Sequence, residues 1–263
     1  MDAATAMTLD GQRLFGVLGD VLWTLLRVGG LMMAAPLIGT RAVPVRVRLI
    51  LSASLALALT PLLPAMPDTG IDAAMVLNAV REMALGVAMG FLLKLAFEAG
   101  AIAGELISQG TGLSFATMAD PLRGQNTGVV GQWFYLAFGL LFFTMDGHLA
   151  LVEMLVDSYR ALPIGTPLPD PVATLSLVPE FFGQVLRAGV LLALPVMMAL
   201  LAVNLVFGVL GRAAAALNPI ALGLPAALLL GLVLLIPLLS QISEPVQDLF
   251  NAAFDTAAAL TGG

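Results

Sequence analysis

Two side chains in this chain of 263 residues could take part in nucleophilic catalysis. Ser114 would be the nucleophile and His148, the one histidine of the sequence, would be its base, as in an intramembrane serine protease. The residues around the serine read Gly-Leu-Ser-Phe and lack the second glycine of the turn that exposes such a nucleophile. A lone serine and a lone histidine are weak support for catalysis, so we expect a protein that is not an enzyme.

The composition argues against metal sites and nucleic-acid binding. With one histidine and no cysteine, the chain has no thiolate ligands, and we expect no metal and no cofactor. The net charge is −6, whereas a nucleic-acid binder would need a basic face. Only 11% of the residues are charged and 60% are hydrophobic, while soluble domains carry roughly 25% charged residues. The composition therefore predicts a membrane protein that crosses the bilayer several times.

Charged side chains interrupt the apolar segments. Exposing a charge to lipid costs roughly 2–3 kcal/mol on insertion scales, so these charges should point into a helix bundle or towards partner subunits. We predict that the following residues face partners: Asp20, Arg27, Arg81, Glu82, Lys94, Glu98 and Glu105. The concentrated positive cluster is formed by Arg41, Arg46 and Arg48. The positive-inside rule puts this cluster in the cytoplasm, and a specific contact with a partner is the alternative interpretation.

An irregular stretch runs from Glu98 to Pro121. Its first half is expected to be helical, with Gly100 and Gly104 four residues apart so that another helix can approach closely. Gly110-Thr111-Gly112 then interrupts the helix, because glycine is permissive for other conformations. The apolar residues 113–118 follow. A non-helical segment at membrane level must be buried in protein or line a passage, and the residues alone leave both possibilities open.

About six hydrophobic segments must position these residues. Several are short, charged or kinked by proline and glycine, although a simple span needs about 20 apolar residues. We therefore predict an all-α, polytopic fold with kinked and broken helices. The segments cover residues 14–38, 49–63, 76–97, 124–145, 188–211 and 213–243.

The second half of the chain has its own organisation. A proline-rich connector at 163–179 precedes it, and its two apolar segments are expected to form a helical hairpin that turns near Arg212. An amphipathic tail, 244–260, follows the hairpin. We predict a single domain over 1–263, with a first part at 1–165 and a second part at 180–263.

Four blocks along nearly the whole chain carry a family resemblance. They are RVGGLMMAAPLIGTRAVPVRVR at 27–48, GELISQGTGLSFATMADP at 104–121, MDGHLALVEMLVDSYRALPIG at 145–165, and Arg212 with Leu217-Asn218 and Gly223-Leu224-Pro225. In type, order and spacing these blocks resemble the FliR family of flagellar export-gate proteins, whose injectisome counterparts are the SpaR-type subunits. One departure is Ala215-Ala216, where family members are expected to carry a Pro-Gln pair.

The resemblance implies a role that hydropathy does not reveal. FliR-type subunits co-assemble with FliP- and FliQ-type subunits into a pore-forming gate of the flagellar basal body, which passes unfolded flagellar proteins across the bacterial inner membrane. FlhB- and FlhA-type membrane proteins are further expected partners. The first part, 1–165, would be FliP-like, and the second part, 180–263, would contain a FliQ-like hairpin.

The resemblance also implies a channel plug in the central block. Its residues in this sequence are Gly110, Gly112, Leu113, Phe115 and Met118. Two alternatives for the whole protein are an injectisome gate subunit and a small-solute secondary transporter. The kinked final hairpin would suit a transporter, but no inverted repeat is visible in the sequence.

Overall fold

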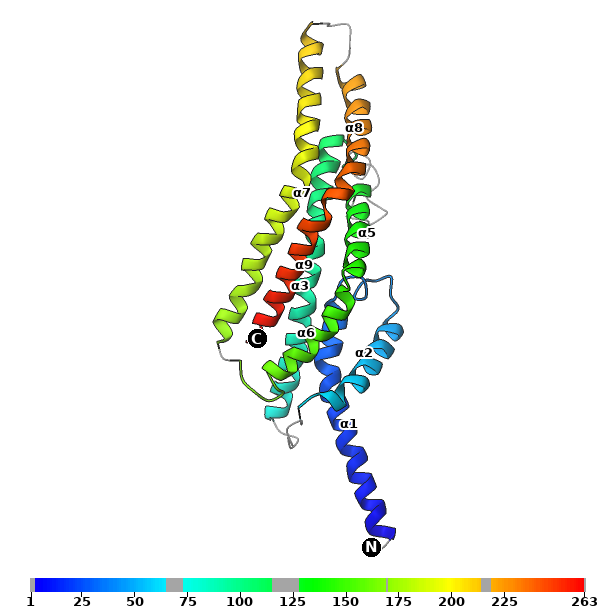
Figure 1. Cartoon of the computed structure of the whole chain (residues 1–263), viewed down its shortest axis with the longest axis vertical. Helices are drawn as coiled ribbons and strands as arrows, with labels where there is room; N and C mark the ends of the chain where they lie inside the picture. The colour runs from blue at the N-terminus through cyan, green and yellow to red at the C-terminus, as the bar shows by residue number, and fades with distance from the viewer. Residues whose placement is uncertain (1–2, 65–72, 115–127, 169, 214–218, 263) are drawn as a thin grey trace. The chain divides into compact units, whose positions relative to one another are not determined.

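The computed structural model describes residues 3–64, 73–114, 128–168, 170–213 and 219–262 (Figure 1). The regular structure of these residues is helical, and they contain no strand. The elements are α1 (Ala3–Ala34), α2 (Val45–Leu59), the short 3-10 helix η1 (Thr60–Leu62), α3 (Ala73–Thr111), α5 (Val129–Thr144), α6 (Gly147–Ala161), α7 (Pro171–Ala213), α8 (Pro219–Gln241) and α9 (Ser243–Ala259). The all-α prediction is confirmed.

Five helices of the described chain are long and apolar enough to cross a membrane. These spans are Gly16–Ala34, Val45–Leu62, Ala73–Thr111, Pro171–Arg212 and Leu222–Gln241. The bent pair of α5 and α6 could form a sixth. This agrees with the predicted polytopic membrane protein of about six segments. One detail differs, because the segment at 76–97 and the helical half of the 98–121 stretch form one continuous helix of 39 residues, α3.

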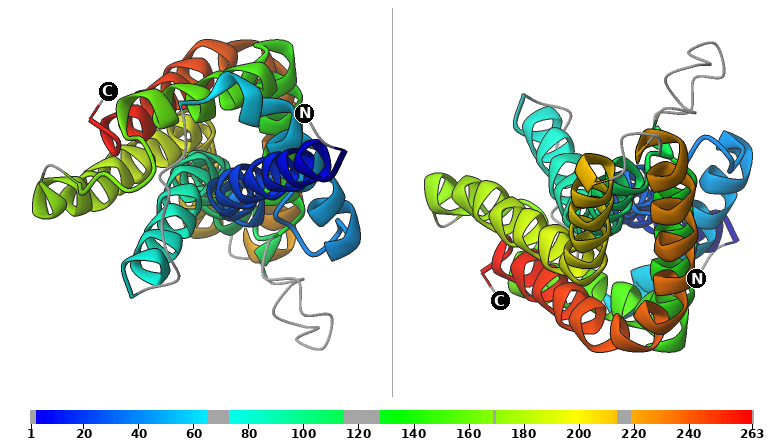
Figure 2. Two further views of the ribbon diagram at one scale, coloured as in Figure 1. Left: turned by 90° about the horizontal axis from the view of Figure 1, so that it is seen from below. Right: turned by 90° about the horizontal axis from the view of Figure 1, so that it is seen from above.

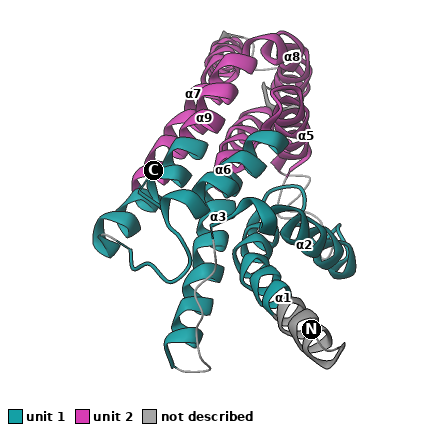
Figure 3. Ribbon diagram, turned by 60° about the horizontal axis from the view of Figure 1, so that its bottom comes forward, with its two compact units in different colours: residues 1–94, 148–179, 253–263 teal, residues 95–147, 180–252 magenta. Residues whose placement is uncertain are grey.

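The chain forms two compact units (Figure 3). Unit 1 comprises Met1–Lys94, His148–Pro179 and Ala253–Gly263, and unit 2 comprises Leu95–Gly147 and Glu180–Ala252. The helices α3, α7 and α9 each contribute residues to both units. The division into 1–165 and 180–263, which follows chain order, stays a prediction.

In unit 1, α2 runs back along α1. Figure 2 shows α2 beside α1 in the view from below, and the hydroxyl of Thr60, which follows α2, lies 3.1 Å from the hydroxyl of Thr24 on α1. Between the two helices the chain turns through Pro36 and Leu37, and the positive φ of Leu37, 67°, lies in the left-handed region. Proline and this backbone conformation are incompatible with a continuing α-helix, so α1 ends at Ala34.

In unit 1, α1 and α3 cross at glycines. A Cβ atom on Gly30 would lie 2.5 Å from the carbonyl oxygen of Met83, and one on Gly90 would lie 2.6 Å from that of Leu31. A Cβ on Gly86 would collide with the α1 backbone as well. The two helices run parallel at this crossing, since later residues of α1 meet later residues of α3. Only glycine permits such a close approach of two backbones.

Unit 2 is built around the second half of α3. Its Gly104 faces Gly131 of α5 so closely that a Cβ would overlap the α5 backbone, and a Cβ on Gly100 would lie 3.1 Å from the ring of Phe138. The predicted small-residue face is confirmed. Phe97 and Phe138 pack in turn against Phe250 of α9, with ring centroids 5.2 Å and 6.0 Å away.

The helices α7 and α8 lie side by side in unit 2, as predicted for the hairpin (Figure 1). A Cβ on Gly223 of α8 would make an ordinary contact, 3.5 Å, with Phe207 of α7. The amphipathic tail is also confirmed, because α9 buries Leu249, Ala253 and the following Leu260.

Candidate functional site

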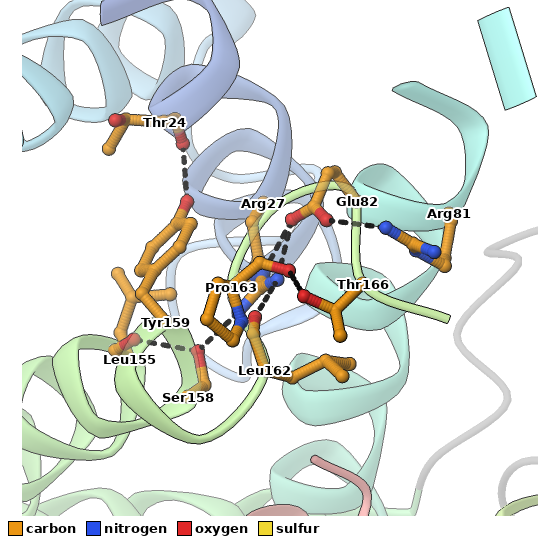
Figure 4. Close-up of polar contacts among 10 residues, drawn as sticks. All are labelled: Thr24, Arg27, Arg81, Glu82, Leu155, Ser158, Tyr159, Leu162, Pro163 and Thr166. Atoms are coloured by element: carbon orange, nitrogen blue, oxygen red, sulfur yellow. Dashed lines mark hydrogen bonds and ion pairs between the residues drawn. The ribbon is translucent and has the colours of Figure 1, made fainter. Parts of the chain in front are cut away.

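Arg27 of α1 is the centre of a buried polar cluster in unit 1 (Figure 4). Its Nε donates to Oε2 of Glu82 on α3 at 2.8 Å, and its Nη2 lies 2.6 Å from the same oxygen. Neither side chain has any exposed surface. Nη1 donates to the Ser158 hydroxyl at 3.1 Å, and Nη2 donates to the Leu162 carbonyl at 3.0 Å. The guanidinium therefore joins α1, α3, α6 and the residue that follows α6.

Tyr159 of α6 covers this ion pair. The guanidinium carbon of Arg27 lies 4.1 Å from the centre of the tyrosine ring, which places the cation over the ring face. The tyrosine hydroxyl donates to the carbonyl oxygen of Thr24 at 2.8 Å, and Figure 4 shows this bond from α6 to α1. The ring excludes solvent from the charges and fixes α6 on α1.

The glycine crossing of α1 and α3 brings the two charges together. Glu82 precedes Gly86 by one helical turn, and the carbonyl of Arg27 lies directly over Gly86. The second carboxylate oxygen of Glu82, Oε1, has no hydrogen bond, but Nη2 of Arg81 lies 3.8 Å away. One buried carboxylate thus lies near two guanidinium groups, which gives the cluster a net positive charge.

The seven charges predicted to face partners occupy different environments. Arg27 and Glu82 have no exposed surface and act as each other's partner within the chain. Asp20 and Arg81 are half-buried, and Lys94, Glu98 and Glu105 are exposed. The prediction of a partner contact thus remains for the five that retain exposed surface: Asp20, Arg81, Lys94, Glu98 and Glu105.

The sequence did not identify Ser158, Tyr159 and Leu162 as members of the Arg27 cluster. A buried arginine has five N–H donors and must find several acceptors, which is the signal that more partners exist. No spacing rule states which distant segment supplies them.

The helix α3 ends where the sequence predicts an interruption. The hydroxyl of Thr111 donates to the carbonyl oxygens of Ile107 at 3.0 Å and Ser108 at 3.1 Å, which closes the last turn. Gly112 has φ +81°, a conformation that glycine adopts without strain, and its N–H donates to the Gln109 carbonyl at 3.3 Å.

The plug residues implied by the resemblance are only partly described. Gly110, Gly112 and Leu113 are half-buried. Phe115 and Met118 lie outside the described residues. Beside the end of α3, unit 2 holds a cavity of about 320 Å³, lined by Gln109, Gly110, Thr111, Gly112, Asn204, Phe207, Gly208, Gly223, Leu224 and Ala227.

The structure also describes the candidate catalytic pair and the arginine cluster. Ser114 belongs to unit 2 and His148 to unit 1. In the arginine cluster, Arg41 and Arg46 are exposed, while Arg48 is half-buried. Among the described residues, no group of three or more His, Cys, Asp or Glu side chains could hold a metal ion.

The family model and the individual relatives that match this chain indicate the same family. The model of the family "Bacterial export proteins, family 1" matches residues 18–253. The flagellar biosynthetic protein FliR of Escherichia coli K12 is 36% identical over 236 residues, 90% of this chain and 90% of the relative. Those of Pectobacterium carotovorum and Caulobacter vibrioides are 34% and 33% identical and cover 96% and 87% of this chain and 96% and 92% of their own lengths. The chain therefore belongs to bacterial export protein family 1, as a member of the FliR family of flagellar biosynthetic proteins.

Proposed function

We propose that this protein is a non-enzymatic subunit of the flagellar protein export gate in the bacterial inner membrane. It co-assembles with FliP- and FliQ-like subunits into a channel of the basal body, and FlhB- and FlhA-type proteins contact that assembly. The channel passes unfolded flagellar proteins. The observation that carries the proposal is the family match over residues 18–253, together with relatives that are named flagellar biosynthetic proteins.

The surface of the chain supports co-assembly. In the membrane-length apolar stretch of α7, only 22% of the residues are buried within the chain. In that of α8 the share is 28%. Lipid could cover the exposed aliphatic side chains, but it could not solvate Glu98 and Glu105, which are exposed on the apolar helix α3. Basic or polar groups of neighbouring subunits, or the water of a channel, would stabilise these two carboxylates.

The segment after α3 is suited to close the channel. Gly110 and Gly112 flank the helix end, and the positive φ of Gly112 turns the chain out of the helix axis. Leu113, Phe115 and Met118 supply apolar side chains, and a thioether and a ring can seal by packing and still deform. At roughly 1.5–3 kcal/mol per buried large side chain, such a plug is closed by a few kcal/mol, which an export drive can overcome.

Co-expression with FliP- and FliQ-like proteins tests the proposal. We expect a stable, monodisperse complex that contains all three proteins, whereas this chain expressed alone should aggregate or be degraded. Omitting either partner is the matched control. A monodisperse and protease-resistant monomer that recruits neither partner would contradict the proposal.

A further inference from the structure

An exposed basic edge lies at the start of α2 in unit 1. Arg41 and Arg46 are both exposed. The third arginine, Arg48, points inward instead, and its Nη2 donates to the carbonyl oxygens of Thr40 at 3.2 Å and Val43 at 3.0 Å. These two bonds tie the loop that contains Arg41 to the first turns of the helix that contains Arg46. Arg41 and Arg46 therefore lie on two segments of the chain that Arg48 holds together.

An apolar stripe continues from this edge along α2. The buried side of α2 consists of Ser52, Ala56 and Leu59. On the opposite side, Ile50 and Leu57 are 67% and 61% exposed. At 100° per residue, Arg46, Ile50, Ala53 and Leu57 fall within about 60° of one another around the helix. A positive charge therefore stands at one end of an uninterrupted aliphatic stripe.

The stretch of sequence that contains the basic edge carries no carboxylate. No aspartate or glutamate occurs in the sequence between Asp20 and Asp68, although acidic residues outnumber basic ones in the whole chain. The helix from Val45 to Leu62 is apolar enough to cross a membrane, and only 17% of its residues are buried within the chain. Arginines at the end of such a helix lie at the level of the lipid headgroups.

We propose that Arg41 and Arg46 bind the phosphate of an anionic phospholipid whose acyl chain lies along Ile50, Ala53 and Leu57. Guanidinium groups bind phosphate oxygens through paired, charge-assisted hydrogen bonds, and a zwitterionic headgroup would bring its own cation to the same edge. An acidic protein segment would match the arginines but would not match the long aliphatic stripe beside them. Such a site binds anionic lipids in preference to zwitterionic ones. Arginines that only set the topology of the chain would need no such preference.

Site-specific photocrosslinking of the full chain tests the proposal. The chain carries a photoreactive amino acid in place of Ile50, is co-expressed with its FliP- and FliQ-like partners, and the complex is reconstituted in nanodiscs that contain equal amounts of phosphatidylglycerol and phosphatidylcholine. Mass spectrometry then counts the lipid adducts of each class. We expect phosphatidylglycerol adducts to exceed phosphatidylcholine adducts. The double change Arg41→Gln with Arg46→Gln should bring the ratio close to one, since each arginine strengthens binding to an anionic surface about fivefold.

Three controls keep the test decisive. Arg160→Gln with Arg187→Gln removes two exposed arginines elsewhere and should leave the ratio unchanged. Arg41→Lys with Arg46→Lys keeps the charge and should retain a clear preference for phosphatidylglycerol, which separates lipid binding from a folding defect. Inorganic phosphate at constant ionic strength should not abolish the preference.

Several results would overturn the proposal. The first is an equal ratio of adducts in the unmodified chain, or an equal loss in both glutamine variants. The second is complete displacement by inorganic phosphate, which would indicate a site for free phosphate. The third is crosslinking of position 50 to an acidic protein segment in place of lipid.

Discussion

The Nη2 atom of Arg27 lies 2.6 Å from a carboxylate oxygen of Glu82, and neither side chain has any exposed surface. The two residues are 55 positions apart in the sequence, and the close crossing of α1 and α3 brings them together. Because the same guanidinium also binds Ser158 and the Leu162 carbonyl, one side chain holds α1, α3 and the end of α6 together. We therefore expect substitutions in this cluster to lower the stability of unit 1.

Glu82→Gln should destabilise unit 1 strongly. The change leaves Arg27 as a buried charge without a counter-ion, which costs about 3–5 kcal/mol. Arg27→Met should be similarly damaging, and the double variant should lose less stability than the sum of the two. Chemical denaturation of the complex measures these losses. The control is Arg160→Gln, which breaks an exposed pair with Asp157 at 3.0 Å and should cost less than about 1 kcal/mol. Equal losses in Glu82→Gln and Arg160→Gln would show that the buried pair has no special weight.

Tyr159→Phe separates the two contributions of the tyrosine. It removes the 2.8 Å hydrogen bond to the Thr24 carbonyl and keeps the ring over Arg27, so we expect a loss of about 1 kcal/mol. Tyr159→Ala also removes the ring and leaves a cavity, so its loss should reach about 3–5 kcal/mol. Both variants are compared by the midpoint of denaturant unfolding. A phenylalanine variant as unstable as the alanine variant would assign the stabilisation to the hydroxyl alone.

Gly104→Ala should disrupt the packing of α3 on α5. Its Cβ would overlap the backbone of Gly131, so one of the two helices must shift. Gly29→Ala is the matched control, because a Cβ there has no neighbour within 4 Å and alanine favours a helix by about 1 kcal/mol over glycine. We expect the first variant to assemble poorly with its partners and the second to assemble normally. Comparable assembly of the two variants would show that the close approach at Gly104 is dispensable.

Deleting residues 113–118 should open the proposed channel without preventing assembly. The deleted segment would supply the apolar side chains of the proposed plug, whereas the last turn of the helix that precedes it is closed by the hydroxyl of Thr111. The measurement is membrane conductance, or sensitivity to small solutes, in cells that express the deletion with its partners. Leu113→Ile, which keeps the apolar volume, is the control and should remain closed. An assembled complex that does not leak would mean that another element closes the channel.

Replacing Arg41, Arg46 and Arg48 by glutamate should prevent correct insertion. The change reverses the sign of the positive cluster that the positive-inside rule assigns to the cytoplasm. It also removes the Arg48 bonds to Thr40 and Val43 and thus releases the loop. Reporter fusions at the end of α2 measure the topology, and swimming assays measure function. Normal topology and motility in the triple variant would refute the assignment.

The sequence by itself determined the class of the fold and the family. Long apolar runs with few charges require helices in a membrane, because only a helix satisfies every backbone group within its own segment. The interruption after α3 was also predictable, because glycine permits backbone conformations that end a helix. Gly112 indeed has a φ of +81°, which few other residues tolerate. The buried side of the tail followed from its 3.6-residue period, and Leu249 and Ala253 are indeed buried.

Tertiary structure decided which polar groups meet and which faces are buried. On α6 a stripe that includes Leu149 and Tyr159 fits the helical period, yet Tyr159 is buried and Leu149 is 58% exposed. Apolar periodicity could not choose the buried face, because in a membrane protein both lipid and protein accept aliphatic side chains. Likewise, the sequence placed Arg27 and Glu82 among charges that need partners but could not pair them. Their pairing depends on how closely two helix backbones approach at Gly86, and that distance is a property of the packed helices.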